Sequence, residues 1–303
     1  MNESMYQYMK VGLVHFMAFP STMKGTGPVL ETIKTLATDD YFNAIEITTI
    51  ADREERRQVQ RILETSHMTV AYGAQPRLLT AGLNVNHVDE KKRKEALDIL
   101  LDGVDEAYEI GASGFSFLSG KYEKATQEVA FEKLLDSTKT VCGYAKSKGD
   151  LRVVLEIFDH DVDKKSLIGP APLALRYVEA VREEYDNFGL MVDLSHIPLL
   201  HETVEESVLP IKDYIMHAHI GNCVLKDPVL NGYGDQHPRF GFPNSENDVE
   251  EVAHYLKVLL DIGFLNKRNP PIVSFEIKPY GDEDPQVVIA NAKRTLNEAW
   301  AKL

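Results

Sequence analysis

Cysteine and tryptophan are scarce in this sequence, whose 303 residues include two cysteines and one tryptophan. Two cysteines cannot cross-link a chain of this length into a disulfide scaffold, so we expect a reducing environment. No apolar run approaches the roughly 18 residues that a transmembrane helix needs. The first ten residues, MNESMYQYMK, lack the apolar stretch of a signal peptide. These absences predict a cytoplasmic protein with no membrane partner.

Positive charge is also in short supply, with 33 lysines and arginines against 47 aspartates and glutamates. The net charge of −14 is opposite in sign to the basic surface on which nucleic-acid binding depends. We therefore expect no nucleic-acid partner. The hydrophobic fraction of 44% and the charged fraction of 26% are typical of a globular protein.

The sequence does contain a series of short apolar runs, most of them without strict alternation of polar and apolar residues. Such runs are typical of strands that are covered on both faces, as in parallel sheets. Eight runs qualify, and they span residues 11–17, 43–48, 68–74, 114–119, 152–158, 189–195, 214–220 and 271–277.

Stretches with the spacing of amphipathic helices lie between the runs. In the stretch that begins at residue 89, apolar residues recur from Ala96 to Ala107, and Gly111 follows as a candidate C-cap. Regular alternation of strand and helix predicts βαβ units and a parallel sheet. Eight units without a break in composition predict a single α/β domain over residues 1–303, a closed (β/α)8 TIM barrel. The segment HFMAFPSTMKGTG lacks a glycine-rich dinucleotide fingerprint, which weakens an open Rossmann sheet as the alternative.

Each of the last four runs ends in a side chain of the kind that binds metals. The four are VVLEIF with Glu156, LMVDLSH with Asp193 and His196, YIMHAHI with His217 and His219, and IVSFEIKP with Glu276. A lone carboxylate in an apolar run is costly unless it is paired, protonated or metal-bound. The carboxyl ends of barrel strands meet at one mouth, so we expect these acidic groups to share one divalent cation.

The two histidines of the seventh run stand two residues apart, and alternation places both on one face of the strand. His219 lies nearer the C-terminal mouth, so we predict it as the ligand and His217 as a layer beneath it. The predicted metal ligands are therefore Glu156, Asp193, His219 and Glu276. An oxygen-rich set with one imidazole favours Mn²⁺, with Mg²⁺, Co²⁺ and Zn²⁺ as alternatives.

A cation held by four protein ligands has positions left for the carbonyl and the adjacent hydroxyl of a sugar. It would polarise the carbonyl as a Lewis acid and acidify the neighbouring C–H. One of Glu156 and Glu276 would then act as base and the other as acid, through an enediolate. His196, just beyond its strand, suits a hydrogen bond to substrate or a role as general base. The sequence thus predicts an enzyme, a divalent-metal-dependent isomerase or epimerase of a ketose or keto-sugar.

Two loops supply further candidates for substrate binding. The stretch FDHDVDKKSLIGP after Glu156 contains His160. The segment of roughly residues 221–247 follows the seventh run and is long for a compact domain, so we interpret it as a lid or substrate loop. It contributes Asp235 and His237, and Lys278 stands at the end of the last run.

The order of Glu156, Asp193 with His196, HAH at 217–219 and Glu276 resembles the sugar phosphate isomerase/epimerase superfamily. These are xylose-isomerase-like TIM barrels, and they include D-tagatose 3-epimerase. In the epimerases, the residues that match the four predicted ligands bind Mn²⁺. The matching glutamates also carry the proton transfer, and the residue that matches His196 contacts substrate. The resemblance therefore implies a manganese-dependent sugar epimerase.

Other functions stay open. The runs EIFDHDVDKKSLIGP and GYGDQHPRFG are similar to the catalytic subunit of C-glycoside deglycosidases, which are metal-dependent C–C lyases of 3-keto-C-glycosides with a small partner subunit. Asp235-Gln236-His237 resembles the zinc-binding D-x-H of AP endonucleases, but the third and fourth runs lack the histidines which that branch also uses. A phosphodiesterase is therefore disfavoured, and a metal-containing binding module without catalysis is the remaining alternative. For the assembly we expect a homo-oligomer, or a hetero-oligomer with a small subunit if the protein is a lyase.

Overall fold

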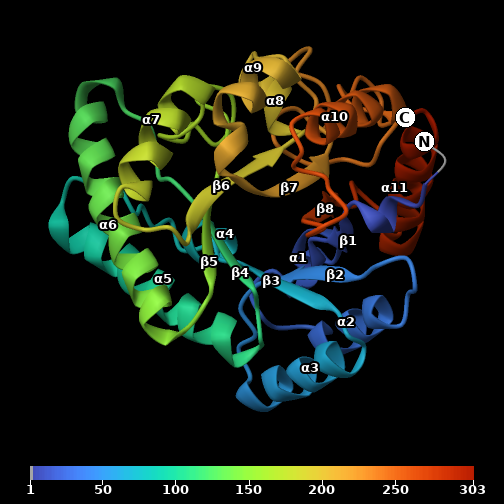
Figure 1. The fold of residues 1–303 in the computed structure, drawn as a ribbon, viewed down its shortest axis with the longest axis horizontal. Helices are drawn as coiled ribbons and strands as arrows, with labels where there is room; N and C mark the ends of the chain where they lie inside the picture. Colours follow the sequence, from blue (N-terminus) through green and yellow to red (C-terminus); the bar gives the residue numbers. More distant parts are fainter. Residues whose placement is uncertain (1–2) are drawn as a thin grey trace.

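In the computed structural model, which describes residues 3–303, eight parallel strands curl round the centre of the molecule (Figure 1). The strands are β1 (Lys10–Leu13), β2 (Ala44–Ile47), β3 (Thr69–Gly73), β4 (Gly114–Leu118), β5 (Arg152–Glu156), β6 (Phe188–Asp193), β7 (Ile215–Gly221) and β8 (Ile272–Glu276). Strands β1 and β2 are joined by a bridge between Val14 and Glu46, so the barrel is nearly closed. The predicted (β/α)8 TIM barrel is confirmed.

Helices follow the strands along the chain, and the longer ones surround the ring of strands on the outside (Figure 1). They are α1 (His15–Ala18), α2 (Val29–Ala37), α3 (Arg53–Thr65), α4 (Gln75–Leu79), α5 (Glu90–Glu109), α6 (Gln127–Lys148), α7 (Ala171–Arg182), α8 (His196–Leu199), α9 (Val204–Val208), α10 (Val249–Asp261) and α11 (Pro285–Ala301). Short 3-10 helices are η1 (Met5–Gln7), η2 (Pro20–Thr22), η3 (Lys124–Thr126) and η4 (Leu209–Tyr214).

Local sequence signals account for several helix ends. The Asp52 side chain accepts a hydrogen bond from the Glu55 N–H at the start of α3, and Asp248 and Glu251 form a capping box at the start of α10. After α5 the backbone turns at Gly111 with a φ of +74°, a conformation in which glycine is favoured.

The first apolar run is the one place where the expected strand is partly helical. Strand β1 ends at Leu13, and residues His15–Ala18 form α1. Four apolar residues fit a strand or a buried helical turn equally well, so periodicity could not separate the two. His15 is buried in this turn, and its Nε2 lies 2.7 Å from Thr32 Oγ1 on α2.

The strands are buried on both faces, as the continuous apolar runs predict. On β4, the outward-facing ring of Phe115 lies against Gly103 of α5 and stacks on Tyr72 at a centroid distance of 5.7 Å. Ser116 faces the opposite way, into the lumen, where its Oγ contacts Gln75. Helices therefore cover the outer face of the sheet, and the polar groups gather inside it.

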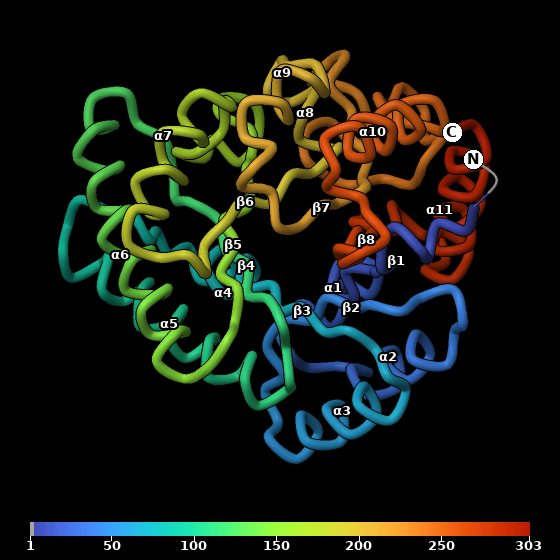
Figure 2. Tube along the Cα trace, viewed as in Figure 1, coloured from blue at the N-terminus to red at the C-terminus, as the bar shows by residue number. Residues whose placement is uncertain are grey.

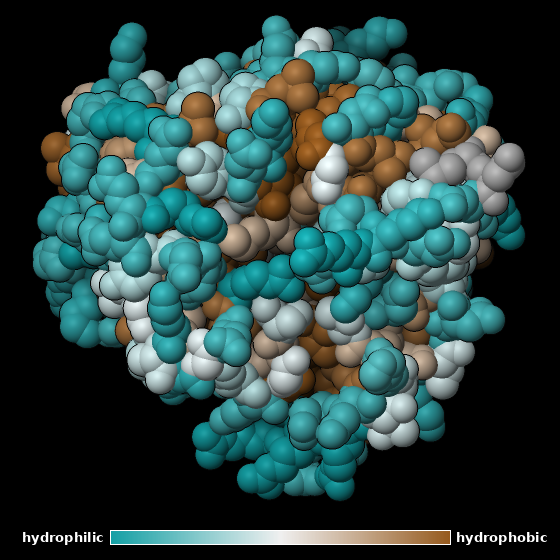
Figure 3. Space-filling model, in the orientation of Figure 1, coloured by the Kyte–Doolittle hydropathy of each residue, from teal (hydrophilic) through white to brown (hydrophobic). Residues whose placement is uncertain are grey.

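The first residues that the structure describes lie beside the C-terminal helix α11 (Figure 2), and Trp300 Nε1 donates a hydrogen bond of 2.8 Å to the Glu3 carbonyl. On the face drawn in Figure 3, hydrophilic residues cover most of the rim, and hydrophobic residues are visible in hollows toward the middle. Among residues 3–303, no helix has the length and apolar character needed to cross a membrane.

The long segment between β7 and α10 is folded back onto the barrel. The Asn222 side chain accepts hydrogen bonds from the N–H groups of Cys223 and Asn247. Asn247 in turn donates to the carbonyls of Gly221 and Leu194, at the ends of two strands. These buried amides hold the segment at the carboxyl end of the sheet.

Candidate metal centre

Strand register brings the four predicted ligands to the same end of the lumen. Glu156 on β5 pairs with Met191, two residues before Asp193 on β6. Asp193 pairs with His219 on β7. Glu276 pairs with Gly221, two residues beyond His219. Paired residues and their i±2 neighbours share a face of the sheet, so all four side chains point inward.

The four side chains form one buried cluster. Nδ1 of His219 lies 2.7 Å from Oε2 of Glu276. The same nitrogen lies 3.3 Å from Oε1 of Glu156 and 3.6 Å from Oδ2 of Asp193. One ligand-type atom from each residue lies within 4.8 Å of the others. None of the four residues is more than 8% exposed.

Two carboxylate oxygens in this cluster lack a donor. Glu156 Oε2 accepts from Gln75 Nε2 at 2.7 Å, and Asp193 Oδ1 accepts from the N–H and Oγ of Ser195 at 2.6 and 2.7 Å. Their other oxygens, Oε1 and Oδ2, are buried with no hydrogen-bond partner in the described part of the chain. These are the atoms that face His219 Nδ1. Unpaired buried carboxylate oxygens are costly, and one divalent cation would satisfy both, so the residues fit a metal site.

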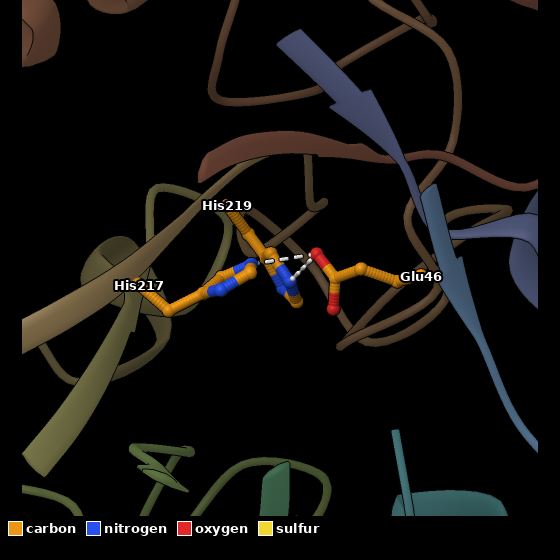
Figure 4. A group of neighbouring side chains, drawn as sticks. All are labelled: Glu46, His217 and His219. Carbon is orange, nitrogen blue, oxygen red and sulfur yellow. Dashed lines mark hydrogen bonds and ion pairs between the residues drawn. The ribbon is translucent and has the colours of Figure 1, made fainter. Parts of the chain in front are cut away.

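Two further buried residues, Glu46 and His217, form a hydrogen-bonded group with His219 (Figure 4). Its Nε2 lies 2.9 Å from Oε1 of Glu46, and His217 Nε2 lies 2.6 Å from the same oxygen. Donation of the Nε2 proton to Glu46 leaves the Nδ1 lone pair of His219 directed at the cluster. Glu46, on β2, therefore pairs with buried bases on β7 across the lumen.

The cluster perturbs the ionisation of its members. Burial raises the pKa of Glu276 to about 7; His237 opposes this rise and Glu156 adds to it. Burial acts to lower the pKa of His219, but the surrounding carboxylates, Glu46 foremost, raise it well above its ordinary value. Without a cation, protons partly neutralise the negative charge here.

A charged network lies beside the cluster, centred on Asp235. Oδ1 of Asp235 lies 2.8 Å from His237 Nε2 and 3.1 Å from His196 Nε2. Oδ2 accepts a hydrogen bond of 2.7 Å from Lys164 Nζ. The other ring nitrogen of His196, Nδ1, donates to the Ile157 carbonyl at 2.7 Å. Asp235 thus binds three cationic or basic groups in a buried position.

Ionisation of this network follows from those contacts. Burial opposes the charged form of each histidine, but Asp235 raises the pKa of His196 to about 10 and that of His237 to about 9. The histidines and Lys164 hold the pKa of Asp235 well below its ordinary value. Both imidazoles therefore carry protons at neutral pH and act as hydrogen-bond donors.

Lys164 reaches Asp235 from the loop that follows β5, and a second aspartate shapes that loop. The carboxylate of Asp159 accepts hydrogen bonds of 2.7–3.1 Å from four consecutive N–H groups, those of residues 162–165. Asp163 accepts a further bond of 2.9 Å from the Asp235 N–H. The β5–α7 loop and the long β7–α10 segment are thereby tied together over the mouth.

A cavity of about 260 Å³ adjoins the cluster. Its polar lining includes Glu156, His219, Asp235, His237, Glu276 and Lys278, together with Glu46, Gln75, Lys164 and Gln236. Its apolar lining is Val14, Phe16, Met17, Pro76, Leu79, Phe158 and Met23. Of the predicted substrate-binding residues, Asp235, His237 and Lys278 thus reach the cavity.

Two other predicted substrate-binding residues lie outside this lining. His196 contacts Asp235 and stacks on Phe158 at a centroid distance of 4.3 Å, so it reaches the cavity through those two residues. His160 stacks on Tyr122, with 3.7 Å between ring centroids. Their predicted contact with substrate stays a prediction.

Sequence reasoning passed over two polar side chains that complete the cluster. Gln75 donates to Glu156, and Ser195 donates to Asp193. Gln75 follows the third strand directly, so a search for polar residues at every strand end would have found it. Ser195 stands inside the DLSH motif but has no residue type that suggests a ligand.

A family model described as "Xylose isomerase-like TIM barrel" matches residues 29–296. No curated protein sequence matches the chain at a significant level. Among solved structures, D-psicose 3-epimerase from Clostridium cellulolyticum H10 is 17% identical with a TM-score of 0.71, covering 97% of this chain and 99% of the other.

Two further solved structures are similar. The 3-keto-D-glucoside 4-epimerase from E. coli is 14% identical with a TM-score of 0.68, and the IOLI protein, which has a bound zinc atom, is 18% identical with a TM-score of 0.72. Each comparison covers 97% of this chain and 99% of the other. At these identities the likeness establishes the shared fold.

Proposed function

The chain belongs to the xylose isomerase-like TIM-barrel family, and from this premise we propose that it is a divalent-metal-dependent isomerase or epimerase of a ketose or keto-sugar. The observation that carries the proposal is the buried cluster of Glu156, Asp193, His219 and Glu276 beside a cavity. The D-psicose and 3-keto-D-glucoside epimerases with the same fold support a sugar as substrate.

Glu156, Asp193, His219 and Glu276 would hold the cation. Three carboxylates and one imidazole favour Mn²⁺, with Mg²⁺, Co²⁺ and Zn²⁺ as alternatives. When bound, the cation would supply a Lewis acid that polarises the carbonyl of the substrate.

Proton transfer falls to the two glutamates that border the cavity. Glu156 and Glu276 enter it from β5 and β8, strands that are separated by β6 and β7. A substrate between them presents one face of its reacting carbon to each. One glutamate would remove a proton from the carbon next to the carbonyl, and the other would return a proton.

Basic groups would orient the oxygen atoms of the sugar. His237 and Lys278 line the cavity, and His237 carries a proton that it can donate. His196 holds Asp235 in place and contacts the lining through it. We propose that these groups fix the position of the substrate and leave the proton transfer to the glutamates.

A C–C lyase acting on 3-keto-C-glycosides is the second candidate, and one observation favours it. One wall of the cavity is apolar, with Phe16 and Met17 from α1, Met23 from the end of η2, and Pro76 and Leu79 from α4. A free sugar offers few apolar atoms to such a wall, whereas an aromatic aglycone would cover it. The first step, deprotonation next to a keto group, is the same.

The proposal is tested by incubating the purified protein, loaded with Mn²⁺, with D-psicose, D-tagatose and 3-keto-glucosides in D₂O. We expect deuterium to enter one carbon next to the carbonyl. The variants Glu156→Gln and Glu276→Gln should each lower the rate about 10²–10⁴-fold, whereas the exposed control Glu54→Gln should not. A protein that is inert until a small subunit is added favours the lyase, and absence of any activating divalent metal contradicts both functions.

A further inference from the structure

The N-terminal end of the barrel holds a second, larger cavity of about 620 Å³. Its lining includes the first residue of six strands: Lys10, Thr69, Gly114, Arg152, Ile215 and Ile272. It therefore lies at the end of the lumen opposite the metal cluster, whose ligands stand at or near the C-terminal ends of their strands. The N-terminal end of a TIM barrel usually contributes to stability, and bulky side chains usually fill the lumen.

Small inward-facing residues leave this end of the lumen hollow. Gly114 pairs in register with Ala71 on one side and with Arg152 on the other, so the three share the lumen face. A Cβ atom added at Gly114 would meet no other atom within 4 Å. The next inward residue on β4, Ser116, is also small. The cavity thus results from small side chains at inward-facing positions on neighbouring strands.

All the ionisable side chains that line this cavity are basic. They are Lys10, Arg152, Lys212 and His217, and no aspartate or glutamate of the described chain is among the lining residues. Acidic residues outnumber lysine and arginine by 47 to 33 in this protein. A basic cavity in an acidic protein concentrates positive potential at one place.

His217 contacts Glu46, but the other three basic groups lack carboxylate partners in the described part of the chain. Lys10 Nζ donates a hydrogen bond of 3.0 Å to Thr69 Oγ1, and within residues 3–303 neither Arg152 nor Lys212 forms an ion pair. Elsewhere on the surface, lysines such as Lys146 pair with a nearby carboxylate. Unpaired cations round a cavity are available to a ligand of opposite charge.

We propose that this cavity binds a small phosphomonoester, at a site separate from the metal cluster. An arginine fork and lysine ammonium groups bind phosphate oxygens well, and Lys10, Arg152 and Lys212 supply three positive charges. A volume of about 620 Å³ lies within the range of small-molecule sites. This inference does not depend on the proposed reaction.

Calorimetric titration of the Mn²⁺-loaded protein with glycerol 3-phosphate tests the proposal, with uncharged glycerol as the ligand control. We expect saturable binding of one phosphomonoester per chain and none of glycerol. The double variant Arg152→Ala/Lys212→Ala should weaken binding at least tenfold. The matched control Lys34→Ala/Lys91→Ala removes two exposed lysines, from α2 and α5, that form no ion pair with the described residues. It should leave binding unchanged.

A second variant blocks the cavity without changing any charge. Gly114→Leu places its side chain in open space on a strand, and it should abolish binding while the melting temperature stays near that of the wild type. Glu276→Gln should bind the phosphomonoester as the wild type does. The proposal is overturned if the wild type shows no saturable binding, if binding survives both the charge and the cavity variants, or if Glu276→Gln abolishes it.

Discussion

At the scale of single residues, hydrogen bonds decide which atoms remain available to a cation. Gln75 and Ser195 each bind one oxygen of a carboxylate and leave the other without a donor. Glu46 acts similarly on His219, because it accepts from Nε2 and leaves Nδ1 directed at the other carboxylates of the cluster. The residues round the cluster thus define a set of atoms that face one point.

Replacing Glu46 with glutamine tests its role in positioning His219. Loss of the carboxylate charge should weaken Mn²⁺ binding about 10–100-fold, as expected for groups that orient a metal-ligating histidine. Saturating Mn²⁺ should restore most of kcat, since Glu46 is neither one of the four proposed ligands nor one of the two proposed proton-transfer groups. Calorimetric titration and kinetics against Mn²⁺ concentration provide the measurements. The control is Glu283→Gln, which removes a carboxylate bound to Arg239; unchanged Mn²⁺ affinity in Glu46→Gln would contradict the role.

His15 makes stability depend on pH. Burial lowers its pKa to about 3, whereas the unfolded chain binds the proton near pH 6.5. The unfolded state therefore binds more protons below that pH, and His15 costs stability as the pH falls from about 6.5 toward 3. When the pH falls from 7 to 5, the free energy of unfolding should decrease by about 2 kcal/mol less in His15→Gln than in the wild type. Urea unfolding at both pH values measures this, and parallel losses in the two proteins would refute it.

At the scale of elements, two loops act together over the mouth of the barrel. Asp159 folds the β5–α7 loop so that Lys164 reaches Asp235 on the β7–α10 segment. Asp163 adds a bond to the backbone of the same segment. The segment that was interpreted as a lid is therefore held by the neighbouring loop as well as by Asn222 and Asn247.

Loss of the Lys164–Asp235 ion pair should make the β7–α10 segment more mobile at the mouth of the barrel and leave the metal ligands in place. Lys164→Met removes the ammonium group and should raise KM several-fold, with a smaller effect on kcat. Hydrogen exchange should quicken in residues 232–238. Lys165→Met is the matched control, because the Lys165 side chain is exposed and forms no ion pair in the described chain. Equal exchange in the two variants would show that Lys164 does not hold the segment.

Sequence patterns predicted the elements better than the contacts between them. Continuous apolar runs and amphipathic stretches gave eight strands and the major helices, but a four-residue apolar turn after Leu13 could not be told from a strand. The link between Glu46 and His217 joins β2 to β7 across the lumen. Such a contact depends on how the barrel closes, which no local pattern encodes. For the same reason, the contact of His196 with Asp235 could not be anticipated from the D-x-x-H motif.

At the scale of the whole molecule, the barrel has two ends of opposite character. Carboxylates gather at the C-terminal end, whereas Lys10, Arg152 and Lys212, which have no carboxylate partner within residues 3–303, line the hollow N-terminal end. Glu46, His217 and His219 lie between the two, with His217 also lining the N-terminal cavity. We expect a cation at the metal cluster to offset the buried carboxylates near the centre and so to stabilise the fold.

Metal removal should therefore lower the stability of the whole protein. A cation present at about 100 times its Kd adds about 2.7 kcal/mol to the folded state. This corresponds to a rise in melting temperature of about 5 °C for a domain of this size. Calorimetry of the protein with EDTA and with Mn²⁺ measures the shift. The shift should vanish in Asp193→Asn. If Mn²⁺ does not change the melting temperature of the wild type, that result would argue against a site inside the barrel.

Anomalous diffraction at the manganese edge, from crystals grown with Mn²⁺, tests the central claim most directly. The account predicts one strong peak per chain within bonding distance of Glu156 Oε1, Asp193 Oδ2, His219 Nδ1 and a carboxylate oxygen of Glu276. Absence of a peak at this place, or a peak only among His196, Asp235 and His237, would contradict it.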